Sequence, residues 1–187
     1  MASIETNTKV GLISKALMLI GEKPLESLSD DRYGATVGAN LFEVIYEDEL
    51  QSNRWRFAME KNALSQVVGA PINEWANIFQ IPTNCLLPIG VYPPQPYEIY
   101  GDKIYTDATS VTLEQLIKPE ITDVPAYFAL LMVYALRKNM IKPITESDNA
   151  EQLAVRQYNA QRAKAQYADA QSRPARPIYD SPFTAVR

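Results

Sequence analysis

Histidine is absent from this 187-residue sequence, and several common catalytic and metal-binding arrangements are excluded with it. Without an imidazole there is no Ser-His-Asp triad, no Cys-His pair and no HExxH zinc site. A histidine pH switch is excluded as well. Neither GxxxxGK[ST] nor GxGxxG occurs in the sequence, so the two familiar glycine-rich phosphate-binding loops are also missing.

Cysteine and long apolar runs are scarce. The single cysteine, Cys85, permits no internal disulfide, which favours folding in a reducing cytoplasm. A cysteine with no histidine to activate it is a weak candidate for a nucleophile. We therefore expect a structural role for Cys85, as a small, buried apolar residue. The apolar run that begins at Ala129 meets Arg137 and Lys138 and is too short for a membrane span. The N-terminal residues MASIETNTKVG lack the pattern of a signal peptide, so the sequence predicts no membrane partner.

Charge is unevenly distributed along the chain, whose formal net charge is −4. Residues 1–150 hold 12 Lys/Arg and 19 Asp/Glu, whereas residues 151–187 hold 6 and 3. A body with net negative charge is expected to bind duplex DNA poorly, since affinity for duplex DNA comes mainly from neutralising its phosphates. The basic end could attract an acidic partner surface, or it is simply a solvated helix face and a loose end.

Apolar periodicity predicts four helices. The first covers residues 6–20 and ends at Gly21; the second covers 31–52, with Ser29 or Asp30 as its N-cap. The third covers 124–141, with Pro125 in its first turn and Pro143 as its stop. The fourth is capped by Thr145 or Ser147 and runs through an alanine-rich stretch, whose small side chains allow another helix to approach closely.

Residues 54–120 do not continue the helical periodicity and instead hold short apolar segments that end at prolines. The segment YEIYGDKIYTD, residues 97–107, predicts a hairpin that turns at Gly101 and Asp102. We expect four or five short antiparallel strands. The sequence therefore predicts an α+β fold: a four-helix body (1–53 and 121–171) interrupted by a small antiparallel β-region (54–120) and followed by an extended C-terminal arm (172–187).

Several motifs follow one another along about 155 residues of the chain. They are ALMLIGEKPL (16–25), YEDEL (46–50), RWRFA (54–58), Trp75 with IPTNCL (81–86), PITES (143–147) and ADAQ (168–171). In this order they resemble the tail tubular protein A family, the head-to-tail adaptors of short-tailed phages, and the first motif resembles the family's opening helix and its ALxxLGExP exit. Two departures are Asn84 before Cys85, where the family has aspartate, and Ile141-Lys142 before the PIT stretch.

This resemblance implies a structural virion protein of the phage tail, assembled in the host cytoplasm and without enzymatic activity or cofactors. Family members form a ring, generally of twelve copies, beneath the portal. The ring connects the portal to the tail nozzle, a tail tubular protein B, and double-stranded DNA passes through its lumen during ejection. An acidic wall suits such a conduit, because it does not bind its cargo tightly. Identical subunits in a ring use heterologous interfaces that close by rotation.

With this resemblance, the C-terminal stretch SRPARPIYDSPFTAVR is predicted to be a portal-docking arm. Prolines lower the entropy lost when an extended arm is ordered, and several arms on one ring gain from avidity. We expect apolar anchors and arginines that pair with portal acids. These predicted docking residues are Arg173, Arg176, Ile178, Tyr179, Phe183 and Arg187.

Aromatic residues provide two further candidate sites. Trp55 and Phe57 are expected to seal the helix-to-β junction, rather than to stack on DNA bases. Tyrosines of the β-region are expected to contact the nozzle or a neighbouring subunit, although they could instead form a sugar-binding platform. The tyrosines proposed as contacts are Tyr97, Tyr100 and Tyr105, and Tyr92 joins them in the sugar-binding alternative.

Two alternative functions remain open at this stage. The first is a tail-associated glycan hydrolase that uses Glu98 with Asp102 or Asp107, since glycosidases need two carboxylates across a cleft. The second is a glycan-binding module built on the tyrosine-rich hairpin. The run Glu47-Asp48-Glu49 is a weaker catalytic candidate, because neighbours on a helix point to different faces and we expect a solvated or interface surface.

Overall fold

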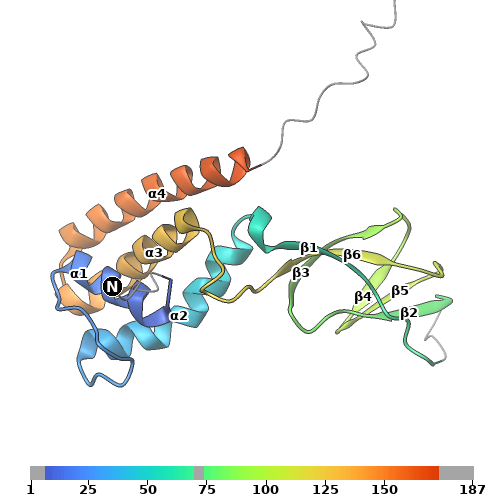
Figure 1. Cartoon of the computed structure of the whole chain (residues 1–187), viewed down its shortest axis with the longest axis horizontal. Coiled ribbons are helices and arrows are strands. Elements are labelled where there is room, and N and C mark those ends of the chain that lie inside the picture. The colour runs from blue at the N-terminus through green and yellow to red at the C-terminus, as the bar shows by residue number, and fades with distance from the viewer. Residues whose placement is uncertain (1–6, 70–73, 173–187) are drawn as a thin grey trace, which may run out of the picture.

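The computed structural model describes residues 7–69 and 74–172, and Figure 1 shows helices at one end and strands at the other. The helices are α1 (Lys9–Ile20), α2 (Tyr33–Gln51), α3 (Ala126–Thr145), α4 (Asp148–Gln171) and the 3-10 turn η1 (Arg56–Ala58). The strands are β1 (Met59–Ala63), β2 (Asn77–Gln80), β3 (Cys85–Tyr92), β4 (Glu98–Tyr100), β5 (Lys103–Thr106) and β6 (Thr112–Ile117). The predicted α+β fold, four helices with a β-region inserted between the second and third, is confirmed. The predicted arm (172–187) lies, apart from Ser172, outside the described residues.

Helix α1 ends at Gly21 as predicted, but it begins at Lys9 rather than at residue 6. The Thr8 side chain accepts a hydrogen bond from the Gly11 N–H and caps the first turn. Gly21 closes the helix at φ 102°, in the left-handed region that glycine adopts without strain, and its N–H donates to the carbonyls of Leu17 and Met18.

Helix α2 starts later than predicted. Its N-cap is Arg32, whereas Ser29 and Asp30 lie outside the helix. Asp30 instead uses its carboxylate to accept bonds from the backbone N–H and the guanidinium of Arg32, which holds the approach to the helix. Further along α2, a Cβ added to Gly38 would lie 2.5 Å from Ile13 Cγ2, so only glycine lets α1 pack this closely.

Helix α3 continues past the proline that was predicted to stop it. Pro143 lies inside the helix, and Pro125 is the N-cap rather than a residue of the first turn. A proline close to the end of a helix removes one backbone hydrogen bond, and its fixed φ is itself helical. The last turn is kept by the Glu146 N–H, which donates to the Lys142 carbonyl, and by Thr145 Oγ1, which donates to the Ile141 carbonyl.

Helix α3 is the centre of the helical body, since it packs against α1, α2 and α4. Its buried residues, among them Phe128, Leu131 and Met132, join a single core with residues of the other three helices. Helix α4 lies along the outside of this body (Figure 1). Its N-cap is Ser147, one of the two predicted cap residues, and the Ser147 side chain accepts from the Ala150 N–H. None of the helices in the described part of the chain is long and apolar enough to cross a membrane.

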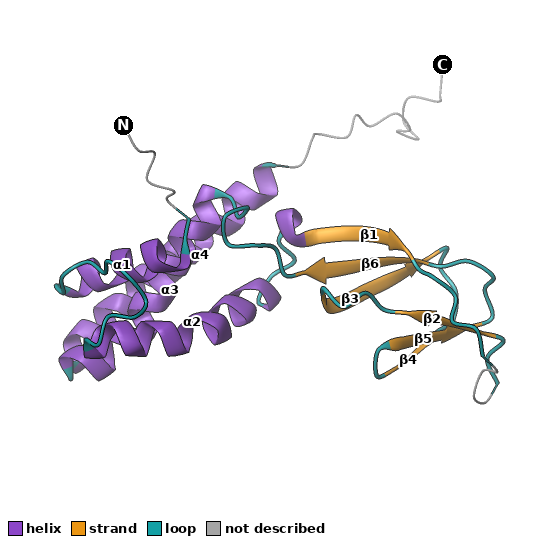
Figure 2. Cartoon of the chain, turned by 60° about the horizontal axis from the view of Figure 1, so that its bottom comes forward, coloured by secondary structure: helices purple, strands orange, loops and turns teal. Residues whose placement is uncertain are grey.

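The described part of the β-region holds six strands rather than the four or five expected, in two three-stranded antiparallel sheets ordered β1-β6-β3 and β2-β5-β4 (Figure 2). The predicted hairpin is confirmed as β4 and β5, with Gly101 at φ 62° in the turn. A second, smaller core includes Phe79, Ile104 and Leu113. Cys85 packs against this core but is only partly buried.

Candidate functional site

The junction between helices and strands is an aromatic cluster. Trp55 is fully buried, and its ring lies 5.2 Å from that of Phe128, measured between centroids. The Phe57 ring lies 4.9 Å from the same phenylalanine, and Tyr127 contacts both Trp55 and Phe57. These contacts fit a sealing role for Trp55 and Phe57 and leave no indole face open for stacking on a base.

A buried carboxylate connects α4 to this junction. Glu49 of α2 is 1 % exposed, and the Tyr158 hydroxyl of α4 donates to its Oε1 at 2.6 Å. The Trp55 indole N–H donates to the backbone carbonyl of the same glutamate at 2.7 Å. Burial raises the pKa of Glu49, and the Tyr158 bond acts in the opposite direction. The cation of Lys138 lies 4.0 Å from the centroid of the Tyr158 ring.

A second buried carboxylate holds the far end of α4. Asp169 is 4 % exposed and accepts from the backbone N–H of Arg56 at 3.1 Å. It also accepts from the Tyr127 hydroxyl at 2.8 Å. Helix α4 is thereby fixed to the segment that enters the first strand. The sequence did not predict the burial of Glu49 or of Asp169, because an acidic residue on a polar helix gives no signal of burial.

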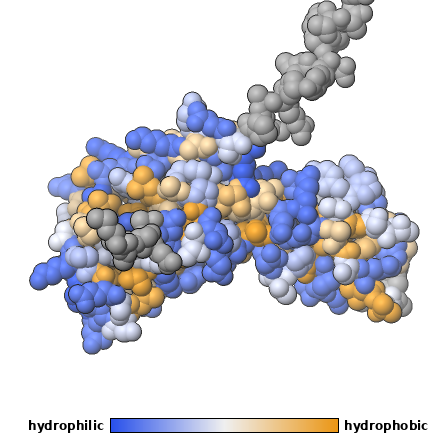
Figure 3. All heavy atoms as spheres, viewed as in Figure 1, coloured by the Kyte–Doolittle hydropathy of each residue, from blue (hydrophilic) through white to orange (hydrophobic). Residues whose placement is uncertain are grey.

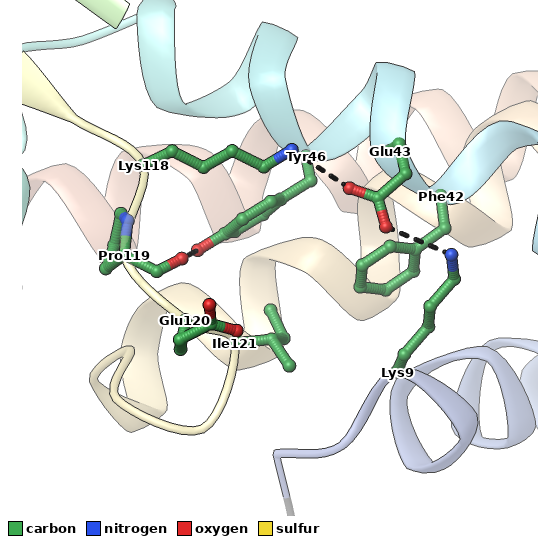
Figure 4. Close-up of a pocket in the computed structure, with 8 residues that line it drawn as sticks. All are labelled: Lys9, Phe42, Glu43, Tyr46, Lys118, Pro119, Glu120 and Ile121. Atoms are coloured by element: carbon green, nitrogen blue, oxygen red, sulfur yellow. Dashed lines mark hydrogen bonds and ion pairs between the residues drawn. The ribbon is translucent and has the colours of Figure 1, made fainter. Parts of the chain in front are cut away.

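A pocket of about 300 Å³ lies where α1, α2 and the segment after β6 meet (Figure 4). Its lining residues are Lys9, Phe42, Glu43, Tyr46, Lys118, Pro119, Glu120 and Ile121. Glu43 accepts from Lys9 at 3.0 Å and from Lys118 at 3.1 Å, and these bonds hold the pKa of its carboxyl below the usual value. The Tyr46 hydroxyl donates to the Pro119 carbonyl at 2.8 Å. Both lysines are engaged by protein carboxylates, which favours a structural joint.

The face of α4 that points away from the body carries a heptad pattern. Leu153, Ala160 and Tyr167 recur every seven residues, and all three are exposed. Ala163 and Ala170, three residues after Ala160 and Tyr167, belong to the same face and are also exposed. We call these five residues the α4 seam. The residues of α4 buried against the body lie on the opposite side: Ala154, Tyr158, Ala165 and Asp169.

Helices α1 and α3, which pack against each other, also carry exposed apolar side chains. Met18 is 57 % exposed, Leu19 42 % and Leu130 47 %. Leu130 lines a shallow groove of about 230 Å³ together with residues of both helices. We call Met18, Leu19 and Leu130 the α1–α3 patch. On the face in Figure 3, hydrophobic residues lie in separate areas among hydrophilic ones, on the helical and the strand-bearing parts alike.

The tyrosines of the β-region do not form one platform. Tyr97 packs against the second core, and Tyr105 is buried, so Tyr100, at 54 % exposure, is the most open of the three predicted contacts. The Tyr100 ring meets the Tyr105 ring at 72°, with 5.5 Å between centroids, which is an edge contact. Tyr92 lies on the other sheet, where Lys61 covers its ring at 4.1 Å from the centroid. A flat sugar-stacking surface from these tyrosines is therefore not favoured.

The carboxylates proposed for a hydrolase are engaged in hydrogen bonds. Glu98 Oε2 accepts from the Trp75 indole and from the Tyr100 hydroxyl, which together hold the pKa of its carboxyl below the usual range. Asp102 accepts from the Gln80 carboxamide, which likewise lowers its pKa. A glycosidase needs one carboxyl with a raised pKa to act as the general acid. These two acids are shifted in the wrong direction for that role.

The remaining candidates from the sequence do not come together in one site. In the run Glu47-Asp48-Glu49, Glu47 is bound by Lys118, Asp48 is exposed and Glu49 is buried, so the expected solvated surface is wrong for Glu49. No cluster of histidine, cysteine, aspartate or glutamate suited to a metal ion occurs among the described residues. The predicted docking residues all lie outside the described part of the chain: Arg173, Arg176, Ile178, Tyr179, Phe183 and Arg187.

Comparison of the sequence with protein-family models and with curated proteins found no match in either case. The resemblance to the tail tubular proteins therefore stays a prediction from the motif order.

Proposed function

We propose that this chain is a non-enzymatic assembly protein that forms an adaptor ring of twelve copies between a phage portal and a tail nozzle. The observation that carries the proposal is the α4 seam. A helix in a globular protein normally has one apolar stripe, whereas α4 has a buried stripe and a second, exposed stripe on its opposite side. A seam with a seven-residue repeat is the pattern by which helices pack side by side.

The interface that we propose joins two different surfaces. The α4 seam of one copy packs against the α1–α3 patch of the next, which makes a heterologous contact of the kind that closes into rings. The alanines of the seam let the neighbouring helix approach closely, and Leu153 and Tyr167 supply the larger apolar contacts. The portal, the nozzle and the passage of DNA enter the proposal through the motif resemblance alone.

The experiment is negative-stain imaging of the chain with the portal protein from the same genome. The full-length chain and a version ending at Gln171 are compared. Rings that stack on the portal support the adaptor role, and stacking by the full-length chain alone also supports the portal-docking arm. Stacking by both versions keeps the adaptor role but removes the arm as the main anchor. Absence of stacking by either version contradicts the proposal.

A further inference from the structure

The side of the β2-β5-β4 sheet that faces away from the second core carries aromatic side chains arranged around a carboxylate. The side chains of Phe79 and Ile104 face the second core. Successive side chains on a strand point to opposite faces, so Gln80, next to Phe79, and Tyr105, next to Ile104, face the other side of the sheet. Glu98 pairs directly with Tyr105 and faces the same side. On that side Glu98 holds the Trp75 indole at 3.0 Å and the Tyr100 hydroxyl at 2.8 Å. We call Trp75, Glu98, Tyr100 and Tyr105 the outer-sheet cluster.

This side of the molecule is acidic. Glu98 is accompanied by Glu74, which lies close enough to act electrostatically on Tyr100. Asp102 binds Gln80, and Asp107 accepts from the backbone N–H beside Trp75. Lys103, which pairs with Tyr100 across the strands, is the basic residue of this group. A carboxylate between an indole and a phenol suits an arginine, whose guanidinium pairs with carboxylates and stacks on aromatic rings.

The C-terminal segment of the same chain has the complementary chemistry. Residues 173–187 hold three arginines and one acid, Asp180, together with apolar side chains and prolines. We propose that in the free protein this segment docks on the outer-sheet cluster of its own molecule, with an arginine against Glu98. This contact is independent of the proposed adaptor role, since it needs no portal and no ring.

The segment is long enough to reach. Asp169, at the end of α4, binds the backbone of Arg56, and ten residues later Gln66 pairs with Phe79 of β2. Ten extended residues span at most about 35 Å, whereas residues 173–187 span up to about 50 Å. A tether of this length gives an effective concentration in the millimolar range, so a weak contact is occupied within one molecule.

Two indole N–H signals in a ¹H–¹⁵N spectrum test the proposal. The Trp75 indole reports on the outer-sheet cluster, and the Trp55 indole, buried in the junction, is the internal control. Truncation after Ser172 is expected to shift the Trp75 signal and leave Trp55 unchanged. A synthetic peptide of residues 173–187, added to the truncated chain, is expected to restore the original position. An unchanged Trp75 signal on truncation overturns the proposal.

Charge variants separate a specific contact from a general attraction. Glu98→Gln keeps a hydrogen-bond acceptor but removes the charge, and it should weaken peptide binding at least fivefold. The matched control is Glu114→Gln on the other sheet, where the carboxylate pairs with Lys61, and it should leave binding unchanged. A peptide with its three arginines replaced by glutamine should not bind. Equal effects of the two glutamate variants overturn the proposal.

Two further outcomes would also overturn it. The Trp75 position in the full-length chain should not change on dilution, because the contact is intramolecular; a concentration-dependent shift assigns the segment to a second copy instead. Tri-N-acetylchitotriose and maltotriose are added separately to the truncated chain. A Trp75 shift with either sugar, and none with the peptide, assigns the cluster to glycan binding.

Discussion

At the scale of single residues, Glu49 makes stability depend on pH. Its buried carboxyl has a pKa raised above the ordinary 4.5, chiefly by burial, and its Oε2 has no hydrogen-bond partner among the described residues. The folded state therefore favours the protonated form. This contribution to stability is complete below the unfolded pKa and is lost as the pH rises through the folded pKa.

Glu49→Gln removes that titration and keeps an oxygen to accept from Tyr158. We expect the unfolding free energy of the variant to be flatter with pH than that of the wild type above about pH 4.5, and at neutral pH to equal or exceed it. Urea unfolding at a series of pH values measures this. Tyr158→Phe is the companion variant, which leaves the carboxylate unpaired and should cost about 1–3 kcal/mol. Parallel pH curves for wild type and Glu49→Gln would contradict the assignment.

Trp55 is the second residue whose effect follows from its contacts. Trp55→Phe keeps an aromatic ring beside Phe128 but removes the donor to the Glu49 carbonyl, and we expect a loss of about 1–3 kcal/mol. Trp55→Ala also opens a cavity and should cost about 3–5 kcal/mol. Chemical denaturation measures both. A base-contacting tryptophan would behave differently, since its removal would leave stability unchanged.

At the scale of elements, the attachment of α4 depends on Asp169. Asp169→Ala leaves the Arg56 N–H and the Tyr127 hydroxyl without their acceptor, which costs about 1–3 kcal/mol. The loss should be local, because Glu49 still holds the earlier part of the helix. We expect amide exchange in the last turns of α4 to speed up about 5- to 150-fold, as measured by hydrogen–deuterium exchange.

Gln166→Ala is the matched control for this prediction. Gln166 is an exposed residue of the same turns, and its replacement should leave the exchange of α4 unchanged. Similar acceleration in both variants would mean that this end of the helix is not held by Asp169.

The elements themselves were largely predictable from the sequence, because caps, turns and apolar periodicity are local signals. Gly21, Ser147 and the Gly101 turn take roles that the sequence predicts, and Thr8, which was not predicted as a cap, caps α1 as a threonine favours. Pro143 does not stop α3 as predicted, because a proline's cost depends on its distance from the helix end and the last turn keeps its local hydrogen bonds to the Ile141 and Lys142 carbonyls.

The candidate sites were much less predictable. Glu49 and Tyr158 are 109 residues apart, and nothing local to either shows that they meet. The outer-sheet cluster joins Trp75 to Glu98 across a strand pairing whose register is known only from the fold. The α4 seam is the exception, because its seven-residue repeat stands in the sequence; only the exposure of that face needed the structure.

At the scale of the whole molecule, the proposed interface has two different faces, and this can be tested by mixing variants. Tyr167→Glu damages the α4 seam and Leu130→Glu damages the α1–α3 patch. Both residues are exposed, at 67 % and 47 %, so the subunit should still fold. Either variant alone should form no rings in the presence of the portal protein, because every contact in its ring contains one damaged face.

A mixture of the two variants should behave differently from either alone. The intact seam of the Leu130→Glu chain can pack against the intact patch of the Tyr167→Glu chain, so the mixture should form heterodimers that extend no further. Sedimentation velocity and native mass spectrometry detect them. Val68→Glu, on a fully exposed residue of the β-region, is the control and should assemble like the wild type. Rings formed by either variant alone would contradict the two-face interface. A mixture that stays monomeric would contradict it too, because a heterologous contact leaves one undamaged pair of faces between these two chains.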